Sequence, residues 1–157
     1  MTLQELNEEL NKLVGEKVVA KLIAGNSVIV YFFGEPGDSS VVSLWLDPTW
    51  RYEQDGRVVL GSGNLSINES DFPSKEEYET EFYRLCALAK PLQGSTLLQI
   101  TVDPNSSDIS LRFSDGQALR NFANSAFDDH SWTYRNIPHK LAVDVSPAGV
   151  SVRVETS

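Results

Sequence analysis

The sequence has little of the residue types that most often carry catalytic or metal chemistry. It contains one cysteine and two histidines among 157 residues. The single cysteine, Cys86, rules out a disulfide within the chain and is typical of a reducing compartment. A structural zinc site needs Cys and His ligands in paired spacings, which one cysteine does not supply. We therefore expect neither a metal ion nor another cofactor.

Long apolar runs are also missing. No run approaches the roughly 20 residues that a membrane-spanning helix needs. The first residues, MTLQELNEELNKL, are amphipathic and acidic, whereas a signal peptide has a basic start and a continuous apolar segment. The sequence therefore predicts a cytoplasmic protein.

Basic residues are scarce relative to acidic ones. The chain has 13 Lys and Arg against 22 Asp and Glu, which gives a formal net charge of −9. This charge repels phosphate backbones and anionic lipids, so we expect neither a nucleic acid nor a membrane as partner. Two interpretations of the acidity stay open: it favours solubility, or it attracts a basic protein partner.

The remaining composition is that of a globular protein. Hydrophobic residues make up 41% and charged residues 22% of the chain. The length suits one domain that buries roughly two thirds of its unfolded surface without metals or disulfides. We therefore expect a single domain over residues 1–157.

The chain contains two passages with matching landmarks. Leu-x-Gly at 13–15 is followed by two alternating apolar runs and Trp-x-Tyr at 50–52. Leu-x-Gly at 92–94 is likewise followed by such runs and by Trp-x-Tyr at 132–134. The pattern predicts an internal duplication, and the alternative is two unrelated groups of hairpins with aromatic residues placed by chance.

The predicted duplication divides the domain into two halves that share one core. The first half covers about 1–58 and the second 74–157. Residues 59–73 are rich in Gly, Ser and Asn and contain a proline, which predicts a connecting loop.

Alternating apolar residues predict strands in both halves. Residues 18–23 and 27–33 form a hairpin around a Gly-Asn turn, and 109–113 places three apolar side chains on one face. Residues 141–145 and 150–154 form a C-terminal hairpin with one buried face and one solvated face.

Two segments predict helices that each precede a Leu-x-Gly. Thr2 with Glu5, and Ser74 with Glu77, are plausible capping boxes. The apolar stripes that follow are Leu6, Leu10 and Leu13 in the first helix, and Tyr78, Phe82, Leu85, Cys86 and Ala89 in the second. The predicted fold class is α+β, a mainly antiparallel sheet partly covered by two helices.

The two Trp-x-Tyr elements are candidates for core or for binding. On a strand, Trp50 and Tyr52 share one face, as do Trp132 and Tyr134. Large aromatic pairs of this kind usually fill a core. The alternative is an exposed aromatic patch that contacts a partner.

The segment FDDHSWTYRN, residues 127–136, gathers Asp128, Asp129 and His130 as candidates for acid–base or magnesium chemistry. The first half builds its Trp-x-Tyr element without a histidine, so the scaffold does not require one. We interpret the segment as structural, and His139 as an exposed or locally bonded residue.

The remaining candidates for chemistry are weaker. Cys86 has acidic and apolar neighbours, which predicts a buried structural thiol, since a reactive thiol needs electropositive surroundings. Gly61–Gly63 has no lysine of a phosphate-binding loop after it. We therefore do not expect an enzyme.

Acidic residues gather in NESDFPSKEEYETE, residues 68–81, which holds six acids and one base. The helix dipole favours acids in a first turn, which accounts for Glu76 and Glu77 but not for Glu69, Asp71 or Glu81. Either this is a solvated face or it is a docking site for a basic partner. The candidate partner-binding residues are Glu69, Asp71, Glu76, Glu77, Glu79 and Glu81, together with Asp128 and Asp129.

The segments SSDISLRFSDGQALRNFANSAFDDHSWTYRN at 106–136 and VVSLWLDPTWRYEQDGRVVLGSGN at 41–64 resemble a pattern of small bacterial proteins. These proteins are similar to immunity proteins, which neutralise toxins of contact-dependent competition systems. The resemblance implies a small, cytosolic, non-enzymatic protein that binds a basic toxin stoichiometrically. It carries over no catalytic or ligand-binding residue.

Two other classes of function stay open. One is a small-ligand or regulatory binding module, with a pocket between the two halves lined by tryptophans. The other is a cryptic hydrolase that uses Asp128, Asp129 and His130.

Overall fold

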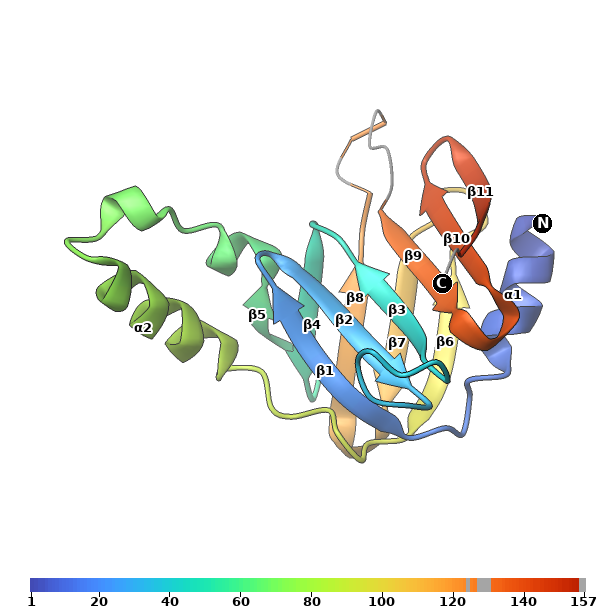
Figure 1. The fold of residues 1–157 in the computed structure, drawn as a ribbon, viewed down its shortest axis with the longest axis horizontal. Helices are drawn as coiled ribbons and strands as arrows, with labels where there is room; N and C mark the ends of the chain where they lie inside the picture. The colour runs from blue at the N-terminus through green and yellow to red at the C-terminus, as the bar shows by residue number, and fades with distance from the viewer. Residues whose placement is uncertain (124, 127–130, 156–157) are drawn as a thin grey trace.

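The computed structural model describes residues 1–123, 125–126 and 131–155, which form two antiparallel sheets and two α-helices (Figure 1). The larger sheet has the order β1 (Val18–Ala24), β2 (Ser27–Phe32), β3 (Val42–Leu46), β9 (Trp132–Asn136), β10 (Leu141–Ser146) and β11 (Gly149–Val154). The smaller sheet has the order β5 (Arg57–Gly61), β4 (Trp50–Gln54), β8 (Gln117–Asn121), β7 (Ile109–Phe113) and β6 (Leu97–Val102). The predicted α+β class is confirmed.

The aromatic pairs of the two Trp-x-Tyr elements lie in the core between the sheets. Trp50 and Tyr52 are both 1% exposed on β4, and Trp132 and Tyr134 are 0% and 2% exposed on β9. All four belong to one hydrophobic cluster that includes side chains of both sheets. The interpretation as core is confirmed, and the alternative of an exposed Trp-x-Tyr patch is wrong.

Each sheet combines three strands from the start of one half with strands from the end of the other half. In the larger sheet, β1, β2 and β3 of the first half are followed by β9 and β10 of the second. In the smaller sheet, β6, β7 and β8 of the second half are followed by β4 and β5 of the first. A duplication would produce this arrangement, and the duplication itself stays a prediction.

The two Leu-x-Gly segments join the halves by reciprocal backbone hydrogen bonds. Gly15 N–H donates to the carbonyl of Leu97, and Gly94 N–H donates to the carbonyl of Val18, both at 2.8 Å. Both glycines have positive φ angles, +95° and +81°, which glycine adopts without steric cost. The start of each half is thereby bound to the start of the other.

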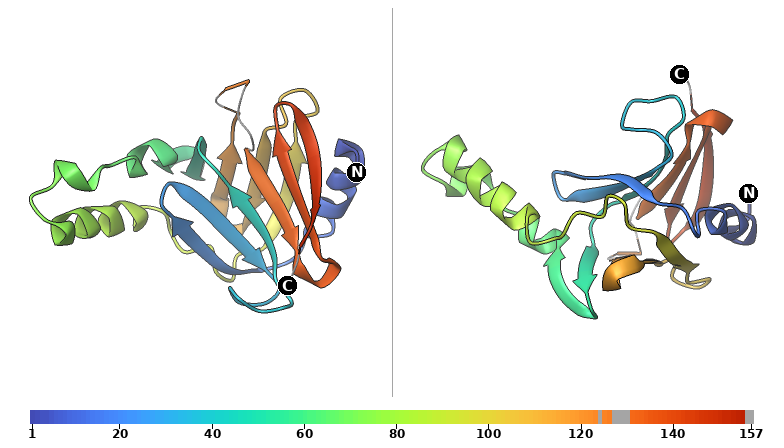
Figure 2. Two further views of the ribbon diagram at one scale, coloured as in Figure 1. Left: turned by 45° about the horizontal axis from the view of Figure 1, so that its top comes forward. Right: turned by 90° about the horizontal axis from the view of Figure 1, so that it is seen from below.

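The two helices differ in how deeply they are buried. α1 (Leu3–Asn11) begins with the predicted capping box at Thr2 and buries Leu6 and Leu10 completely. α2 (Lys75–Cys86) begins at the predicted cap Ser74, but of the predicted capping box the described residues show only the bond from Glu77 N–H to Ser74, and no residue of the helix is buried. Figures 1 and 2 show α2 extending away from both sheets. Of the predicted apolar stripe, Phe82, Leu85 and Cys86 pack partly against the core and Ala89, just after the helix, is buried in it, whereas the N-terminal part of α2 lies beyond the sheets.

The predicted connecting loop 59–73 begins too early. Its first three residues continue β5, because Leu60 pairs with Tyr52 and Gly61 pairs with Arg51 on β4. Two short 3₁₀ helices follow, η1 (Ser62–Leu65) and η2 (Glu69–Asp71). Neither helix in the described residues is long and apolar enough to cross a membrane.

The C-terminal hairpin forms as predicted, but its apolar face is only partly buried. Val143 and Val145 of β10 are 0% exposed, whereas Val152 and Val154 of β11 are 45% and 76% exposed. The reason is that β11 is the edge strand of the six-stranded sheet, and the facing sheet has one strand fewer to cover it.

Candidate functional site

We name residues 69–86, which comprise η2, the turn after it and α2, the acidic arm. Ser74 Oγ accepts a hydrogen bond from Glu77 N–H at 3.2 Å and so fixes where the helix begins. At the other end, Lys21 Nζ donates to the carbonyls of Ala89 and Lys90 at 3.4 and 3.1 Å. The arm is therefore held to the larger sheet just beyond its C-terminal end.

The predicted acidic residues lie together along this arm. Glu69, Asp71, Glu76 and Glu77 are exposed, and in the described part of the chain they form no ion pair. Glu79 pairs with Lys75 at 3.6 Å, and a bidentate contact with Arg84 lowers the pKa of Glu81. Within the described ranges, four of these six carboxylates thus form no ion pair. Asp128 and Asp129 lie outside the described residues.

Aromatic side chains line the same arm. The Phe72 and Tyr78 ring centroids are 5.7 Å apart, those of Tyr78 and Phe82 are 6.2 Å apart, and those of Phe82 and Tyr83 are 5.9 Å apart. Tyr83 is 68% exposed and the other three are partly buried. We name these four residues the aromatic ladder. An apolar strip surrounded by charge is typical of a protein-binding surface.

The sequence pattern placed Tyr78 and Phe82 on the apolar stripe of the helix and did not single out Phe72 or Tyr83. Phe82 packs partly against the core, as do Leu85 and Cys86. The helical periodicity correctly predicted which residues lie on one face of α2. It contains no information on how far the sheets extend beneath that face.

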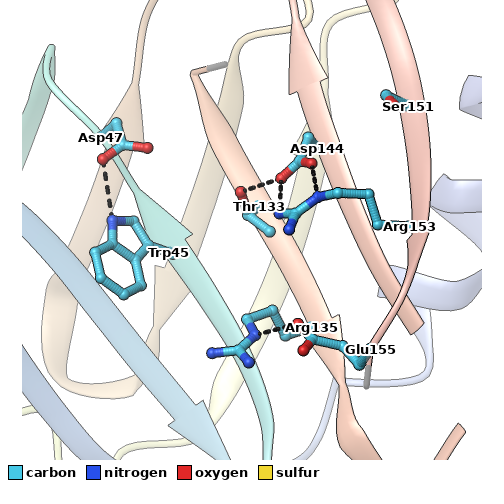
Figure 3. A pocket seen from close by; sticks show the side chains of 8 residues that line it. All are labelled: Trp45, Asp47, Thr133, Arg135, Asp144, Ser151, Arg153 and Glu155. Carbon is cyan, nitrogen blue, oxygen red and sulfur yellow. Dashed lines mark hydrogen bonds and ion pairs between the residues drawn. The ribbon is translucent and has the colours of Figure 1, made fainter. Parts of the chain in front are cut away.

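A second candidate site lies on the outer face of the larger sheet, where β3, β9, β10 and β11 enclose a groove of about 610 Å³ (Figure 3). Its residues are those that alternation turns away from the core. The groove is lined by Trp45, Asp47, Thr133, Arg135, Asp144, Ser151, Arg153 and Glu155.

Ion pairs and hydrogen bonds order the side chains of this groove. Arg153 binds Asp144 through two nitrogens, and Thr133 Oγ1 donates to the same carboxylate at 2.8 Å. Arg135 Nε donates to Glu155 at 2.7 Å, and this contact lowers the pKa of Glu155. The groove therefore presents polar groups in fixed orientations.

This groove lies between the predicted halves, since Trp45 and Asp47 come from the first half and its other lining residues from the second, but one tryptophan lines it where several were expected. Trp50 and Trp132 fill the core, where their indole N–H groups donate to the carbonyls of Asn26 and Ser107 at 2.6 and 2.8 Å. The tryptophan that lines a groove is Trp45, whose position opposite Leu44 and Leu46 in the alternation of β3 was the available signal.

The candidates for chemistry have different outcomes. Asp128, Asp129 and His130 lie outside the described residues. His139 is exposed and lies beside the Asn136 amide at 3.3 Å, as expected for a locally bonded histidine. Cys86 is only partly buried, which corrects the expectation of full burial, and desolvation raises the pKa of its thiol. Within the described ranges, no three His, Cys, Asp or Glu side chains are grouped as metal ligands.

The sequence matches no protein-family model, no curated protein and no solved structure.

Proposed function

We propose that this chain is a non-enzymatic, cytoplasmic binding protein that neutralises a basic toxin by stoichiometric binding. The observation that carries the proposal is the acidic arm, which projects from the sandwich with four uncompensated carboxylates beside a partly exposed aromatic ladder. The resemblance of 41–64 and 106–136 to immunity-type proteins supports the same function.

The two components of the arm have different roles in this proposal. The carboxylates attract a basic partner over several ångströms and so raise the association rate, which falls as salt screens them. The aromatic ladder is desolvated on contact and so lowers the dissociation rate. Glu79 and Glu81 contribute less to the attraction, because Lys75 and Arg84 compensate their charge.

The test is capture of partners by the tagged protein from a lysate of the source cell, with washes at low and then high salt. We expect a small basic protein that is retained at low salt and whose toxicity is relieved by co-expression of this chain. The double variant Glu76→Lys, Glu77→Lys should release it and abolish protection.

A matched control is Glu8→Lys with Glu35→Lys, which changes the net charge equally at exposed positions outside the arm. This variant should retain the partner and protect the cell. If both double variants release the partner equally, the net charge rather than the arm is responsible. If no protein is retained, or the retained protein is not toxic, the proposed function is wrong.

A further inference from the structure

The groove that contains Trp45 continues across the outer face of the larger sheet. A second hollow of about 620 Å³ shares Arg135 and Glu155 with it, so the two meet at this ion pair. The second hollow is walled in part by apolar side chains, namely Tyr31, Val41, Ile137 and Pro138. Together the hollows suit an elongated ligand, since each has the volume of a typical small-molecule site.

Two of the four carboxylates that line the hollows bind an arginine within the groove, while Asp47 accepts hydrogen bonds from Ser27 and the Trp45 indole and Asp38 accepts one from Glu35 N–H. Asp144 is held by Arg153, and Glu155 is held by Arg135. An anionic ligand at Arg135 or Arg153 competes with a carboxylate already bound there, and a cationic ligand at Asp144 or Glu155 competes with a guanidinium. At these two ion pairs the groove therefore favours a neutral ligand, which can hydrogen-bond to the paired groups without separating them.

Hydrogen-bonding capacity nevertheless remains. Arg135 reaches Glu155 through Nε, and its terminal nitrogens turn toward the side of the groove where Trp45 lies (Figure 3). Ser151 also lines this hollow. These groups suit a ligand with several hydroxyls, because a guanidinium donates and a serine hydroxyl both donates and accepts.

One aromatic ring lines each hollow. Tyr31 pairs with Ser43 on β3, and Trp45 lies two residues further along the same strand. The side chains of all three residues point outward from the sheet, and the small Ser43 is only 2% exposed between its larger neighbours. Two aromatic surfaces spaced along a groove suit a polymer whose repeating units each have an apolar face.

We propose that this groove binds a neutral oligosaccharide. The C–H faces of successive sugar rings lie on Trp45 and Tyr31, while ring hydroxyls accept hydrogen bonds from Arg135 and bond to Ser151. The ion pairs Asp144–Arg153 and Arg135–Glu155 stay intact and hold the polar groups in place. The two hollows share no lining residue with the acidic arm, and this proposal does not depend on the proposed function.

The test titrates the full chain with cellohexaose, maltohexaose and N-acetylchitohexaose, up to about 10 mM to include weak binding. Trp50 and Trp132 are buried, so a ligand in the groove changes mainly the emission of Trp45. We expect one of these probes to bind with unit stoichiometry and with an affinity insensitive to salt, since no ion pair is formed.

Variants locate the site by calorimetry. Trp45→Ala and Arg135→Met should each weaken binding about tenfold or more, which corresponds to about 1.4 kcal/mol. Tyr83→Ala, on the arm, should leave sugar binding unchanged. Capture of a basic protein should in turn be unaffected by Trp45→Ala, which separates this proposal from the proposed function.

Three outcomes overturn the proposal. The first is that none of the three sugars binds at the highest concentration. The second is that a sugar binds equally well to the wild type and to Arg135→Met, with both proteins folded by circular dichroism. The third is that hexamers of glucuronic acid or glucosamine bind more tightly than the neutral probes and lose affinity in salt, which assigns the groove to a charged ligand.

Discussion

The two helices occupy corresponding places in the chain and have different surroundings. Each begins at a hydroxyl cap, Thr2 or Ser74, that accepts the backbone N–H three residues on at 3.2 Å. Each is followed by a Leu-x-Gly that joins the other half. Yet α1 buries Leu6 and Leu10 completely, and α2 buries no residue.

The difference shows that an amphipathic pattern specifies a face without specifying what covers it. The face of α1 is aliphatic and fits within the core cluster. The face of α2 begins with two aromatic residues, Tyr78 and Phe82, and its C-terminal part, at Phe82, Leu85 and Cys86, packs partly against that cluster. The remaining aromatic surface is available to a partner, which is why the acidic arm and not α1 carries the proposed function.

The largest expected effect compares the same substitution in both helices. Leu10→Ala creates a cavity in the core and should lower the free energy of unfolding by about 2–5 kcal/mol. Leu85→Ala removes a partly exposed side chain and should cost about 1 kcal/mol. Chemical denaturation measures both, and equal losses would mean that α2 is packed as firmly as α1.

A loss of stability at alkaline pH is expected from Tyr52, which lies in the core between the sheets and not in either helix. Burial raises the pKa of Tyr52 to about 12 from its ordinary value of 10.0, so the folded state holds this proton more tightly than the unfolded state. The stability from Tyr52 is therefore complete below pH 10 and is lost as the pH rises through 12. Denaturation midpoints across this range should fall steeply.

The variant Tyr52→Phe should flatten that fall. Some slope should remain, because burial also raises the pKa of Tyr134. At neutral pH the variant loses the hydrogen bond to Gln117, so its stability is compared only with its own value at lower pH. An unchanged slope would show that Tyr52 is not the responsible group.

The helix caps give a smaller effect that separates global from local stability. Thr2→Ala and Ser74→Ala each remove a capping bond that is typically worth about 1 kcal/mol. Thr2→Ala should lower the global free energy of unfolding, since α1 belongs to the core. Ser74→Ala should instead speed amide exchange within α2 and leave the protection of β3 and β9 unchanged.

The smallest expected effect is at the most exposed aromatic residue of the ladder. Tyr83→Ala should change the free energy of unfolding by less than about 0.5 kcal/mol, since the side chain is 68% exposed. Its effect on capture of the basic partner should be much larger. A loss of stability comparable to that of Leu85→Ala would place Tyr83 in the fold and not in the binding surface.

Much of the fold followed from local patterns. Both helix caps, the hairpins at 18–32 and 141–154, and the shared inner face of Ile109, Leu111 and Phe113 were predicted correctly, because period and turn chemistry are local properties. The connecting loop was placed too early, because the pairing of Leu60 with Tyr52 depends on a neighbouring strand.

The candidate sites were predicted unevenly for the same reason. The acidic residues of the arm were found from composition, whereas Trp45, Arg135 and Glu155 were not singled out. These three come from β3, β9 and the residue after β11, which are far apart in the sequence. Only the strand order brings them to one groove.

The sequence by itself determined the antiparallel α+β class, the inward direction of both Trp-x-Tyr pairs and the acidic character of the arm, since each depends on residue type and short spacing. Tertiary structure alone decided the crossing of each half from one sheet to the other, the exposure of α2 and the composition of the groove. These depend on which strands are neighbours and where the sheets end, and side-chain periodicity contains neither quantity.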